Sequence, residues 1–498
     1  MKNNFKHKRY PFLRALNLAK DVVFRLSRNL DSIVKGNDQV IESPYAVNAA
    51  KILRDWDAIF NAGEMLLELK ELELANRSKF GPRSIAIPWD DRKVSVVESF
   101  GFGKKVILRA KGVRYNLRPL TIKAALKYIK NDTNSGLPFY VKKGLVKDLY
   151  LETIADRRMT EEYPCVMFTR TQENKKTRTV WGYPLWDIIR EMLFYRPLLE
   201  YQRKLVWRSS LVSPDAVNHR LTYIIDTAKV NGYKLLSIDF SAYDNSVKYW
   251  LQKAAFGYIK GLFQTSYHSE IDRIFERFNT IGLITPDGIM TGPHGVPSGS
   301  AFTNEVDSIV QYIIATEYGE IYFDIQGDDG AYATADPEGL MKFFEICGLK
   351  VNREKSYISD SYLVYLQCLY HEKYRRNGVI CGIYPTYRAL NRILFLERFT
   401  DLESVEISGK DYFSIRTICI LENCKYHPLF RELVEFVYKL DKYNLQYTEQ
   451  GLQKYIQNMK SSTGVQGILN YRYEDNVTGI ADFETVKILK SLTGGIPG

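Results

Sequence analysis

Residues 325–331 read Ile-Gln-Gly-Asp-Asp-Gly-Ala, a pair of adjacent acids between two glycines. Apolar and polar residues alternate from Ile321 to Gln326, which predicts a half-buried strand before the acids. Ala331 to Thr334 is predicted as the returning strand, and the flanking glycines permit the positive φ of a sharp turn. Such a tip is either solvated or neutralised by a cation, and the turn alone does not decide between the two.

Further acids lie upstream, after the apolar run Leu235–Ile238. Asp239 ends this predicted strand, and Asp244 follows at a strand-to-helix corner. An acid at the end of one strand and an acid pair on a neighbouring hairpin can converge on two divalent ions. Mg²⁺ prefers such oxygen ligands. Two ions about 3.5–4 Å apart can activate a hydroxyl and stabilise the leaving oxygen in phosphoryl transfer, as a polymerase requires.

A flexible loop, Gly295–Ser300, and a predicted helix separate the two groups of acids. One face of the helix is apolar and is interpreted as core. The other face is polar and begins near the loop, so Ser298 and Asn304 can reach a sugar hydroxyl. Polar helix faces are more often simply solvated.

Three segments together resemble motifs A, B and C of viral RNA-dependent RNA polymerases, in order and at workable spacing. They are Asp239-x4-Asp244, Ser298-Gly299-x3-Thr303-Asn304 and Gly327-Asp328-Asp329. The sequence is most similar to polymerases of double-stranded RNA viruses of the picobirnavirus and partitivirus group, roughly over residues 134–370. The resemblance implies an α+β right-hand fold of fingers, palm and thumb, with a palm of antiparallel sheet on helices, closed by an N-terminal extension.

The resemblance also implies roles for individual residues. Asp239 and Asp328 would bind two Mg²⁺ ions, with Mn²⁺ as the alternative ion, and Asp329 would assist. Asp244 and Asn304 would test the ribose 2′-hydroxyl, because a site built to bond that group rejects a nucleotide lacking it. The residues expected to bind the nucleotide are Arg170, Lys176, Arg178, Asp244, Ser298, Gly299, Thr303 and Asn304.

Two basic clusters, Phe168–Arg170 and Lys175–Gly182, flank a polar turn before Asp239. A hairpin here would direct several cations to one point, where arginine binds phosphate bidentately and lysine acts as a point charge. The segment is similar to motif F, with Arg178 the best match for the arginine that contacts the triphosphate. Charge runs usually form solvated faces, and only the position before motif A favours function.

Two weaker resemblances flank these motifs. Asn134–Pro138 is a predicted turn similar to motif G, so Ser135 and Gly136, together with Lys175, are expected to bind RNA. Gly348–Ser356 resembles motif D, which makes Lys355 the candidate general acid for the departing pyrophosphate. An exposed loop lysine is the simpler alternative. Tyr362–Gln367 would be the strand of motif E.

The amino-terminal segment Lys2–Arg28 is basic, with an apolar series along it. Three interpretations stay open: an amphipathic helix that carries cations to RNA, capsid or fingers, a mitochondrial transit peptide, or a helix packed on the body. Residues 45–76 are predicted to be helical. Ile85–Leu120 is predicted to form strands, and its many cations indicate either a template-guiding lobe or a protected sheet edge.

Composition agrees with a polyanionic partner. The net charge is +11, because Lys and Arg outnumber Asp and Glu by 69 to 58, and the pI is near 9.0. The six cysteines show no paired spacing and are expected to be reduced thiols. No apolar stretch has membrane-spanning length, so no membrane partner is expected.

We therefore expect a helical extension over residues 1–80 that bridges fingers and thumb, fingers over 81–234, a palm over 235–372 with an inserted fingers segment at about 248–292, and a helical thumb and tail over 373–498. The expected partners are RNA template and product duplex, ribonucleoside triphosphates and a viral coat protein. A monomer in the virion interior and host cytoplasm is expected, and the tail Gly494–Gly498 is expected to be mobile.

Two other functions stay open. One is a reverse transcriptase-like polymerase, although those enzymes exclude ribonucleotides with a bulky side chain where this chain offers Asp244 with Asn304. The other is a catalytically silent RNA-binding or capsid-associated protein, against which the intact acids and Arg178 argue.

Overall fold

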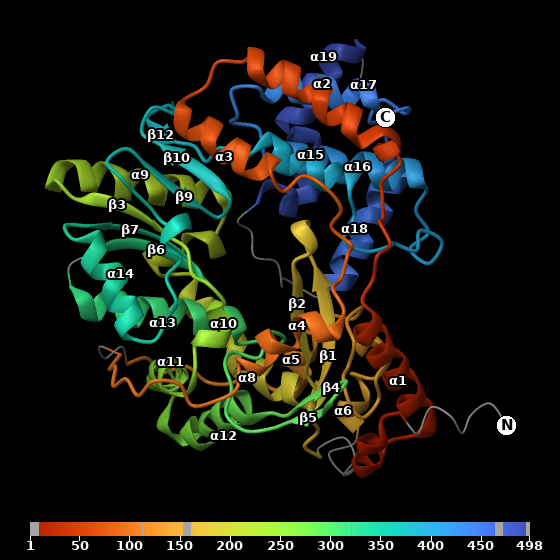
Figure 1. Ribbon diagram of the computed structural model, residues 1–498, viewed down its shortest axis with the longest axis vertical. Helices are drawn as coiled ribbons and strands as arrows, with labels where there is room; N and C mark the ends of the chain where they lie inside the picture. The colour runs from red at the N-terminus through yellow and green to blue at the C-terminus, as the bar shows by residue number, and fades with distance from the viewer. Residues whose placement is uncertain (1–8, 111–113, 153–160, 320, 464–471, 495–498) are drawn as a thin grey trace.

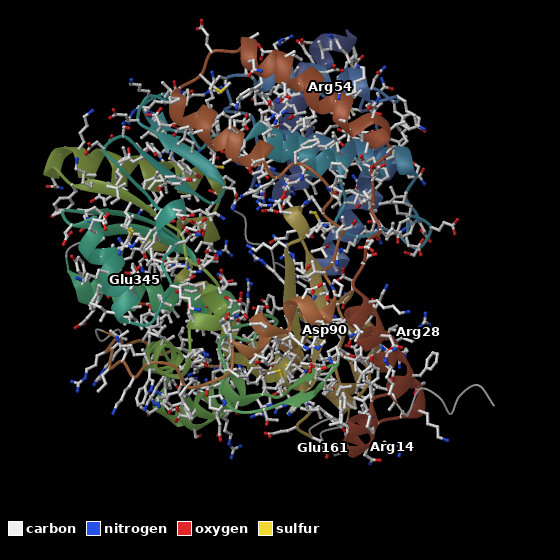
Figure 2. The ribbon with its side chains drawn as sticks, viewed as in Figure 1. Arg14, Arg28, Arg54, Asp90, Glu161 and Glu345 are labelled. Atoms are coloured by element: carbon white, nitrogen blue, oxygen red, sulfur yellow. The ribbon has the colours of Figure 1, made fainter. Side chains whose placement is uncertain are left out.

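The computed structural model describes residues 9–110, 114–152, 161–319, 321–463 and 472–494. Two four-stranded sheets and a group of C-terminal helices are arranged around the centre of the molecule (Figure 1). Charged side chains such as Arg54, Asp90 and Glu345 project from the outside of this arrangement (Figure 2). Helices and antiparallel sheets in one chain are the predicted α+β fold class.

One sheet carries the acidic segments. Its strands are β3 (Lys234–Ile238), β6 (Tyr322–Gln326), β7 (Asp329–Thr334) and β8 (Tyr357–Ser359), in the order β6-β7-β3-β8, and all neighbours are antiparallel. Leu235 and Ala331 pack against α9 (Pro214–Asn231), whereas Leu236 and Tyr332 pack against α13 (Thr303–Tyr318) and α14 (Pro337–Ile346). The predicted sheet on helices is thus confirmed.

Strand β6 differs from its prediction as a half-buried strand. Its alternating polar residues Asp324 and Gln326 are buried as well as its apolar ones. The reason is that η6 (Val206–Leu211) covers the polar face, where Ser209 and Ser210 donate hydrogen bonds of 2.8 and 2.7 Å to those two side chains. The alternation of apolar and polar residues in β6 therefore separates two buried faces, an apolar face in the core and a polar face bonded to η6.

The second sheet has the order β2-β1-β4-β5. Strands β1 (Cys165–Thr171) and β2 (Thr177–Gly182) form the predicted basic hairpin around η5 (Glu173–Lys175). The hairpin β4 (Leu283–Thr285) and β5 (Gly288–Met290), also predicted, joins it by parallel pairing of β4 with β1. Since α11 (Tyr249–Leu262) and α12 (His268–Thr280) precede β4, the chain leaves the first sheet after β3, enters the second and returns.

The strands predicted between Ile85 and Leu120 are wrong where the structure describes this region. Residues 89–97 form helix α4 (Trp89–Val97), and no strand occurs in residues 98–110. Pro88 precedes the helix, Asp90 and Asp91 occupy its first turn, and its buried side chains Trp89, Arg92 and Val96 recur at helical spacing. The strand prediction rested on alternating apolar residues, and one of these, Val94, is 64% exposed on the helix.

The amino-terminal helices contact both ends of the molecule (Figure 1). Helix α1 (Lys20–Lys35) shares a core with β1, and Asn29 donates a 2.9 Å hydrogen bond to the Met167 carbonyl. This is the helix packed on the body among the three interpretations, and residues 1–8 lie outside the described residues. Helices α2 (Ala49–Ala62) and α3 (Leu67–Arg77), predicted as helical, pack near the C-terminal helices.

The C-terminal region is helical as predicted, with α15 (Thr386–Leu394), α16 (Gly409–Glu422), α17 (Phe430–Leu440), α18 (Glu449–Thr463) and α19 (Glu484–Thr493). Trp56 Nε1 donates a 3.1 Å hydrogen bond to Thr386 Oγ1 and so joins α2 to α15. The expected tail lies, from residue 495, outside the described residues, and the expected domain boundaries stay a prediction.

The remaining helices and strands complete the fold. They are η2 (Pro11–Leu16), η3 (Ala46–Asn48), α5 (Ile122–Leu126), η4 (Lys143–Leu145), α6 (Leu149–Glu152), α8 (Leu185–Gln202), α10 (Tyr243–Ser246), η7 (Thr265–Tyr267), η8 (Arg353–Lys355), β9 (Tyr362–Tyr365), β10 (Cys368–His371), β11 (Arg375–Arg376), β12 (Val379–Ile380) and η9 (Tyr473–Asp482). All six cysteines are free thiols, as predicted. Within the described ranges, no helix combines the length and apolarity needed to cross a membrane.

Candidate active site

The acidic turn between β6 and β7 is held by helix α13. Gly327 adopts φ +62°, which places Asp328 at the tip. The Gly327 N–H donates to Ser308 Oγ and its carbonyl accepts from Gln311 Nε2, both at 2.8 Å. Ser308 and Gln311 are three residues apart and share one face of α13. Both backbone groups of the turn glycine are therefore fixed by one helix.

Asp239 follows β3 and lies beside this turn, because Ile238 pairs with Gly330 in the sheet. The segment predicted as motif D holds its backbone: the Asp239 N–H donates to Ser356 Oγ at 3.0 Å, and its carbonyl accepts from the Asn352 N–H at 2.8 Å. Acids from two strands thus meet at one end of the sheet, as predicted.

Mutual proximity changes the pKa values of these acids. Desolvation and then Asp328 raise the pKa of Asp329 to about 8, although Leu366 N–H donates to its Oδ2 at 2.8 Å. Desolvation followed by Asp244 raises the pKa of Asp328, against the effect of Arg178. Desolvation also raises the pKa of Asp239, and Lys355 acts in the opposite direction. Nearby cations would therefore favour the ionised forms.

The donor chemistry fits a divalent cation. Asp239, Asp328 and Asp329 offer carboxylate oxygens, the ligands that Mg²⁺ prefers, and a cation would relieve the repulsion among them. No three His, Cys, Asp or Glu side chains in the described part of the chain are already arranged as a metal site. The roles of these three acids as ligands therefore stay a prediction.

The loop that carries Ser298 is packed between Asp244 and strand β2. Val296 N–H donates to the Asp244 carbonyl at 2.8 Å, and Trp181 N–H donates to the Ser298 carbonyl at 3.0 Å. Gly299 passes so close to β2 that a Cβ would lie 1.8 Å from the Trp181 carbonyl oxygen. Ser298 Oγ donates to Asp244 Oδ2, so these two predicted residues do meet.

Thr303 and Asn304 face other parts of the site. The Thr303 hydroxyl donates within the loop, to the Pro297 and Ser300 carbonyls at 3.3 and 3.1 Å. Asn304 Oδ1 accepts from Gln326 Nε2 at 3.3 Å and therefore lies against the acidic turn. The contact of Asn304 with ribose stays a prediction.

Asp307, which the sequence did not single out, is the helix residue that hydrogen-bonds Asp244. It lies one turn after Thr303 on α13, and it is buried. Desolvation, followed by Asp244, raises the pKa of Asp307 well above its usual value. Burial therefore favours the neutral form of Asp307 beside the Asp244 carboxylate. Its Oδ1 is buried without a hydrogen-bond partner among the described residues.

The basic hairpin faces the acids. Arg170 and Arg178 are paired across β1 and β2, and both side chains are exposed. Desolvation lowers the pKa of Lys176, Arg178 and Lys355 lower it further, and Asp328 acts against them. Those interactions place Lys176 between the cations and the acids. Lys175 is exposed at the turn with φ +56°.

The RNA contact predicted for Ser135 and Gly136 stays a prediction. Both residues are buried, and Ser135 Oγ accepts from Val141 N–H at 3.2 Å. Gly136 has φ +61°, and a Cβ there would lie 2.4 Å from the Tyr183 carbonyl oxygen. The turn at Ser135 and Gly136 packs against the chain that follows β2, and both residues shape this loop.

Lys355 lies at the surface in η8, close enough to Asp239 to oppose the rise in its pKa. The expected neighbourhood is present, while its role as a general acid stays a prediction.

A buried polar network beneath the acidic turn was missed. Arg208 donates to both oxygens of Glu305 at 2.7 Å, and both side chains are completely buried. Arg208 also donates to Gln326 Oε1 at 3.4 Å. No spacing signals this pair, because its partners lie 97 residues apart. The only cue was a charged residue inside the otherwise apolar and hydroxylic segment of η6.

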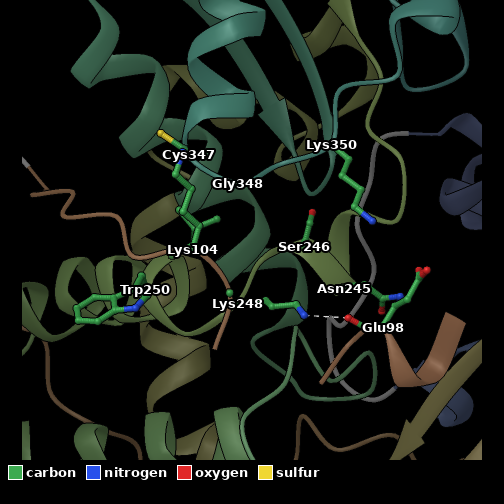
Figure 3. A pocket seen from close by; sticks show the side chains of 11 residues that line it. Glu98, Lys104, Asn245, Ser246, Lys248, Trp250, Cys347, Gly348 and Lys350 are labelled. Carbon is green, nitrogen blue, oxygen red and sulfur yellow. Dashed lines mark hydrogen bonds between the residues drawn. The ribbon is translucent and has the colours of Figure 1, made fainter. Parts of the chain in front are cut away.

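A pocket of about 140 Å³ lies behind the Asp244 segment (Figure 3). Lysines from three segments line it, namely Lys104, Lys248 and Lys350. Lys248 Nζ donates to the carbonyls of Glu98 and Phe100 at 2.9 and 3.1 Å, which ties residues 98–104 to the chain after Asp244. Desolvation, then Lys350, lowers the pKa of Lys248. The hydrogen bonds of Lys248 beside this pocket therefore help to hold the chain that follows Asp244.

Known crystal structures have a similar overall fold. The crystal structure of the RNA-dependent RNA polymerase of a human picobirnavirus matches with a TM-score of 0.78 and 26% identity over 99% of both chains. An insertion-loop deletion mutant of such a polymerase matches with a TM-score of 0.79, 26% identity and the same coverage.

Sequence relatives agree. A potential RNA-dependent RNA polymerase of a human picobirnavirus (strain Human/Thailand/Hy005102/-) is 28% identical over 92% of this chain and 95% of its own length. The RNA-directed RNA polymerase of Cryptosporidium parvum virus 1 (strain KSU-1) is 24% identical over 41% of this chain and 42% of its own. The model of the family described as viral RNA-dependent RNA polymerase matches residues 97–375, more than half of the chain. With its acids and cations gathered at one end of the sheet, this chain belongs to the viral RNA-dependent RNA polymerases.

Proposed function

We propose that this RNA-dependent RNA polymerase adds ribonucleotides with two Mg²⁺ ions, Mn²⁺ being the alternative ion, held by Asp239, Asp328 and Asp329. Divalent metal ions are general in this family. The observation that carries the proposal is the convergence of acids from neighbouring strands, with Ile238 paired to Gly330 and with cations facing them. When bound, the ions would activate the attacking 3′-hydroxyl and offset charge on the phosphates.

The residues opposite the acids would hold the substrate. Arg178 and Lys176 would bind the triphosphate, Arg178 by paired hydrogen bonds and Lys176 as a point charge. Lys355, beside Asp239, would protonate the departing pyrophosphate. These groups act mainly by positioning and by electrostatic stabilisation, because they are held in place before the reaction.

The pair of Asp244 and Asp307 would recognise the ribose. Ser298 donates to Asp244, and Asp307 hydrogen-bonds the same carboxylate, which fixes its position. The free Oδ1 of Asp307 would otherwise stay buried without a partner. A 2′-hydroxyl that joins this group is favoured, and a deoxyribose leaves polar atoms unpaired.

The test is incorporation of labelled ribonucleotides on a single-stranded RNA template with and without Mg²⁺. We expect Asp328→Ala to lose activity by at least about 10²–10³-fold. The matched control is Asp360→Ala, an exposed acid paired to Lys234 at 2.6 Å at the opposite end of the same sheet, which should stay active. Equal activity in both variants would mean that the acids are wrongly assigned.

We also propose that the protein works as a monomer, in the virion interior and host cytoplasm, together with viral coat protein. Light scattering of the purified protein measures its oligomeric state. Co-purification with coat protein tests the partner. Polymerase recovered without coat protein would contradict the association, and a dimer in light scattering would contradict the monomer.

A further inference from the structure

The tip of the basic hairpin is held by residues from distant parts of the chain. Glu173, at the start of η5, lies 3.2 Å from Arg83 Nε and 3.8 Å from Arg388 Nη1. Arg83 belongs to the segment after α3, and Arg388 belongs to α15. Figure 1 shows the hairpin β1–β2 pointing toward α15. The contact therefore joins the hairpin to both the amino-terminal segment and the C-terminal helices.

These charges are shielded from water. The side chains of Glu173, Arg83 and Arg388 are 12%, 8% and 15% exposed, so ionic interactions between them are little screened. Desolvation alone would raise the pKa of Glu173, yet Arg83 and Arg388 hold it below its usual value. Without the carboxylate, two arginines would face one another. Glu173 thus lies within 3.8 Å of both arginines and offsets their mutual repulsion.

The segment after α3, which contains Arg83 and Ile87, makes further contacts near the hairpin. Arg83 Nη2 donates to Glu397 Oε1 at 2.7 Å, and Glu397 lies 3.9 Å from Arg170 on β1. The Ile87 N–H donates to Thr177 Oγ1 on β2 at 3.1 Å. Both strands of the hairpin are thereby connected to residues outside their sheet. A shift of the tip would change the direction of the cations that β2 carries.

The tip also borders the acids. Desolvation lowers the pKa of Lys79, Lys355 and Arg388 lower it further, and both Glu173 and Asp239 act against them. Lys79 therefore lies near both Glu173 at the hairpin tip and Asp239, a candidate metal ligand.

We propose that Glu173 is a positioning residue for nucleotide binding: by joining Arg83 and Arg388 it holds the hairpin that presents Lys176 and Arg178 to the triphosphate. This rests on the proposed function, since it assumes that those two cations bind the nucleotide. The consequence is that affinity for the nucleotide depends on contacts made by the amino-terminal segment and by α15.

The experiment measures kcat and KM for a ribonucleoside triphosphate on a homopolymer RNA template with Mg²⁺, in the full chain. Glu173→Gln and Arg388→Gln should each raise KM about tenfold with kcat within about twofold, since they remove binding and leave the acids in place. The double variant should be no worse than Glu173→Gln, because both changes remove one interaction. Equilibrium binding of a fluorescent nucleotide should weaken in parallel.

The matched control is Glu435→Gln, which removes a surface ion pair of 2.9 Å with Arg431 on α17 and should leave KM unchanged. Unchanged KM in folded Glu173→Gln and Arg388→Gln would overturn the inference, and if Glu173→Gln does not fold, Arg388→Gln decides alone. The result is independent of Asp328→Ala, whose retained activity would instead refute the proposed metal ligands.

Discussion

The acidic turn and the basic hairpin face each other but are supported in opposite ways. Beneath the turn the polar groups are buried: Gly327 is bonded on both sides by α13, and the ion pair of Arg208 and Glu305 is completely enclosed. The hairpin carries its cations on exposed strands and is held chiefly at its tip. From this difference we expect the region beneath the turn to govern stability and the hairpin to govern affinity for the nucleotide.

The largest effect on stability should come from Glu305→Ala. Removing this carboxylate leaves Arg208 as an unpaired buried charge, which lowers the free energy of unfolding by about 3–5 kcal/mol. Urea unfolding followed by fluorescence measures the change. The control replaces both partners, Arg208→Met with Glu305→Leu, and should recover most of the loss. A fully stable Glu305→Ala variant would remove the basis of the comparison.

A smaller effect, dependent on pH, is expected at Asp324. Desolvation raises the pKa of this carboxyl from 3.8 to about 7, so the folded chain binds a proton that the unfolded chain has released. Its contribution is complete below the unfolded pKa and is lost as the pH rises through about 7, by on the order of 2–4 kcal/mol. Asp324→Asn should flatten the dependence of unfolding free energy on pH between these values. An unchanged slope would contradict the assignment.

The smallest effect on stability is expected for Arg178→Gln. The side chain is exposed, so the free energy of unfolding should change by less than about 1 kcal/mol. KM for the nucleotide should nevertheless rise by about 10–100-fold, the cost of losing a charge-assisted hydrogen bond. Arg170→Gln, its neighbour across the hairpin, is the matched comparison and should change KM less. A loss of stability as large as that of Glu305→Ala would show that the two regions are not distinct.

The sequence predicted those parts of the site that are local. Each acid motif combines a strand, a turn and a carboxylate within ten residues, so its chemistry can be recognised before the fold is known. The hairpin at Gln172–Asn174 was predictable for the same reason.

The unpredicted parts depend on contacts between distant segments. Asp307 was indistinguishable from a solvated residue on a polar helix face until Asp244 was placed beside it. The strand prediction for Ile85–Leu120 failed at residues 89–97, because alternation occurs by chance in a short helix whose acidic first turn and buried Trp89 favour the helix. Asp324 looked like the wet side of a strand because nothing in the sequence shows that η6 covers it.

The bond from Trp56 to Thr386 has a consequence for synthesis. The two residues are 330 positions apart, so α2 is completed long before α15 leaves the ribosome. At about 5–20 residues per second, the apolar face of α2 waits roughly 15–65 s for its partner. During this interval the apolar face of α2 in a newly made chain lacks the C-terminal helices that bury it in the folded protein.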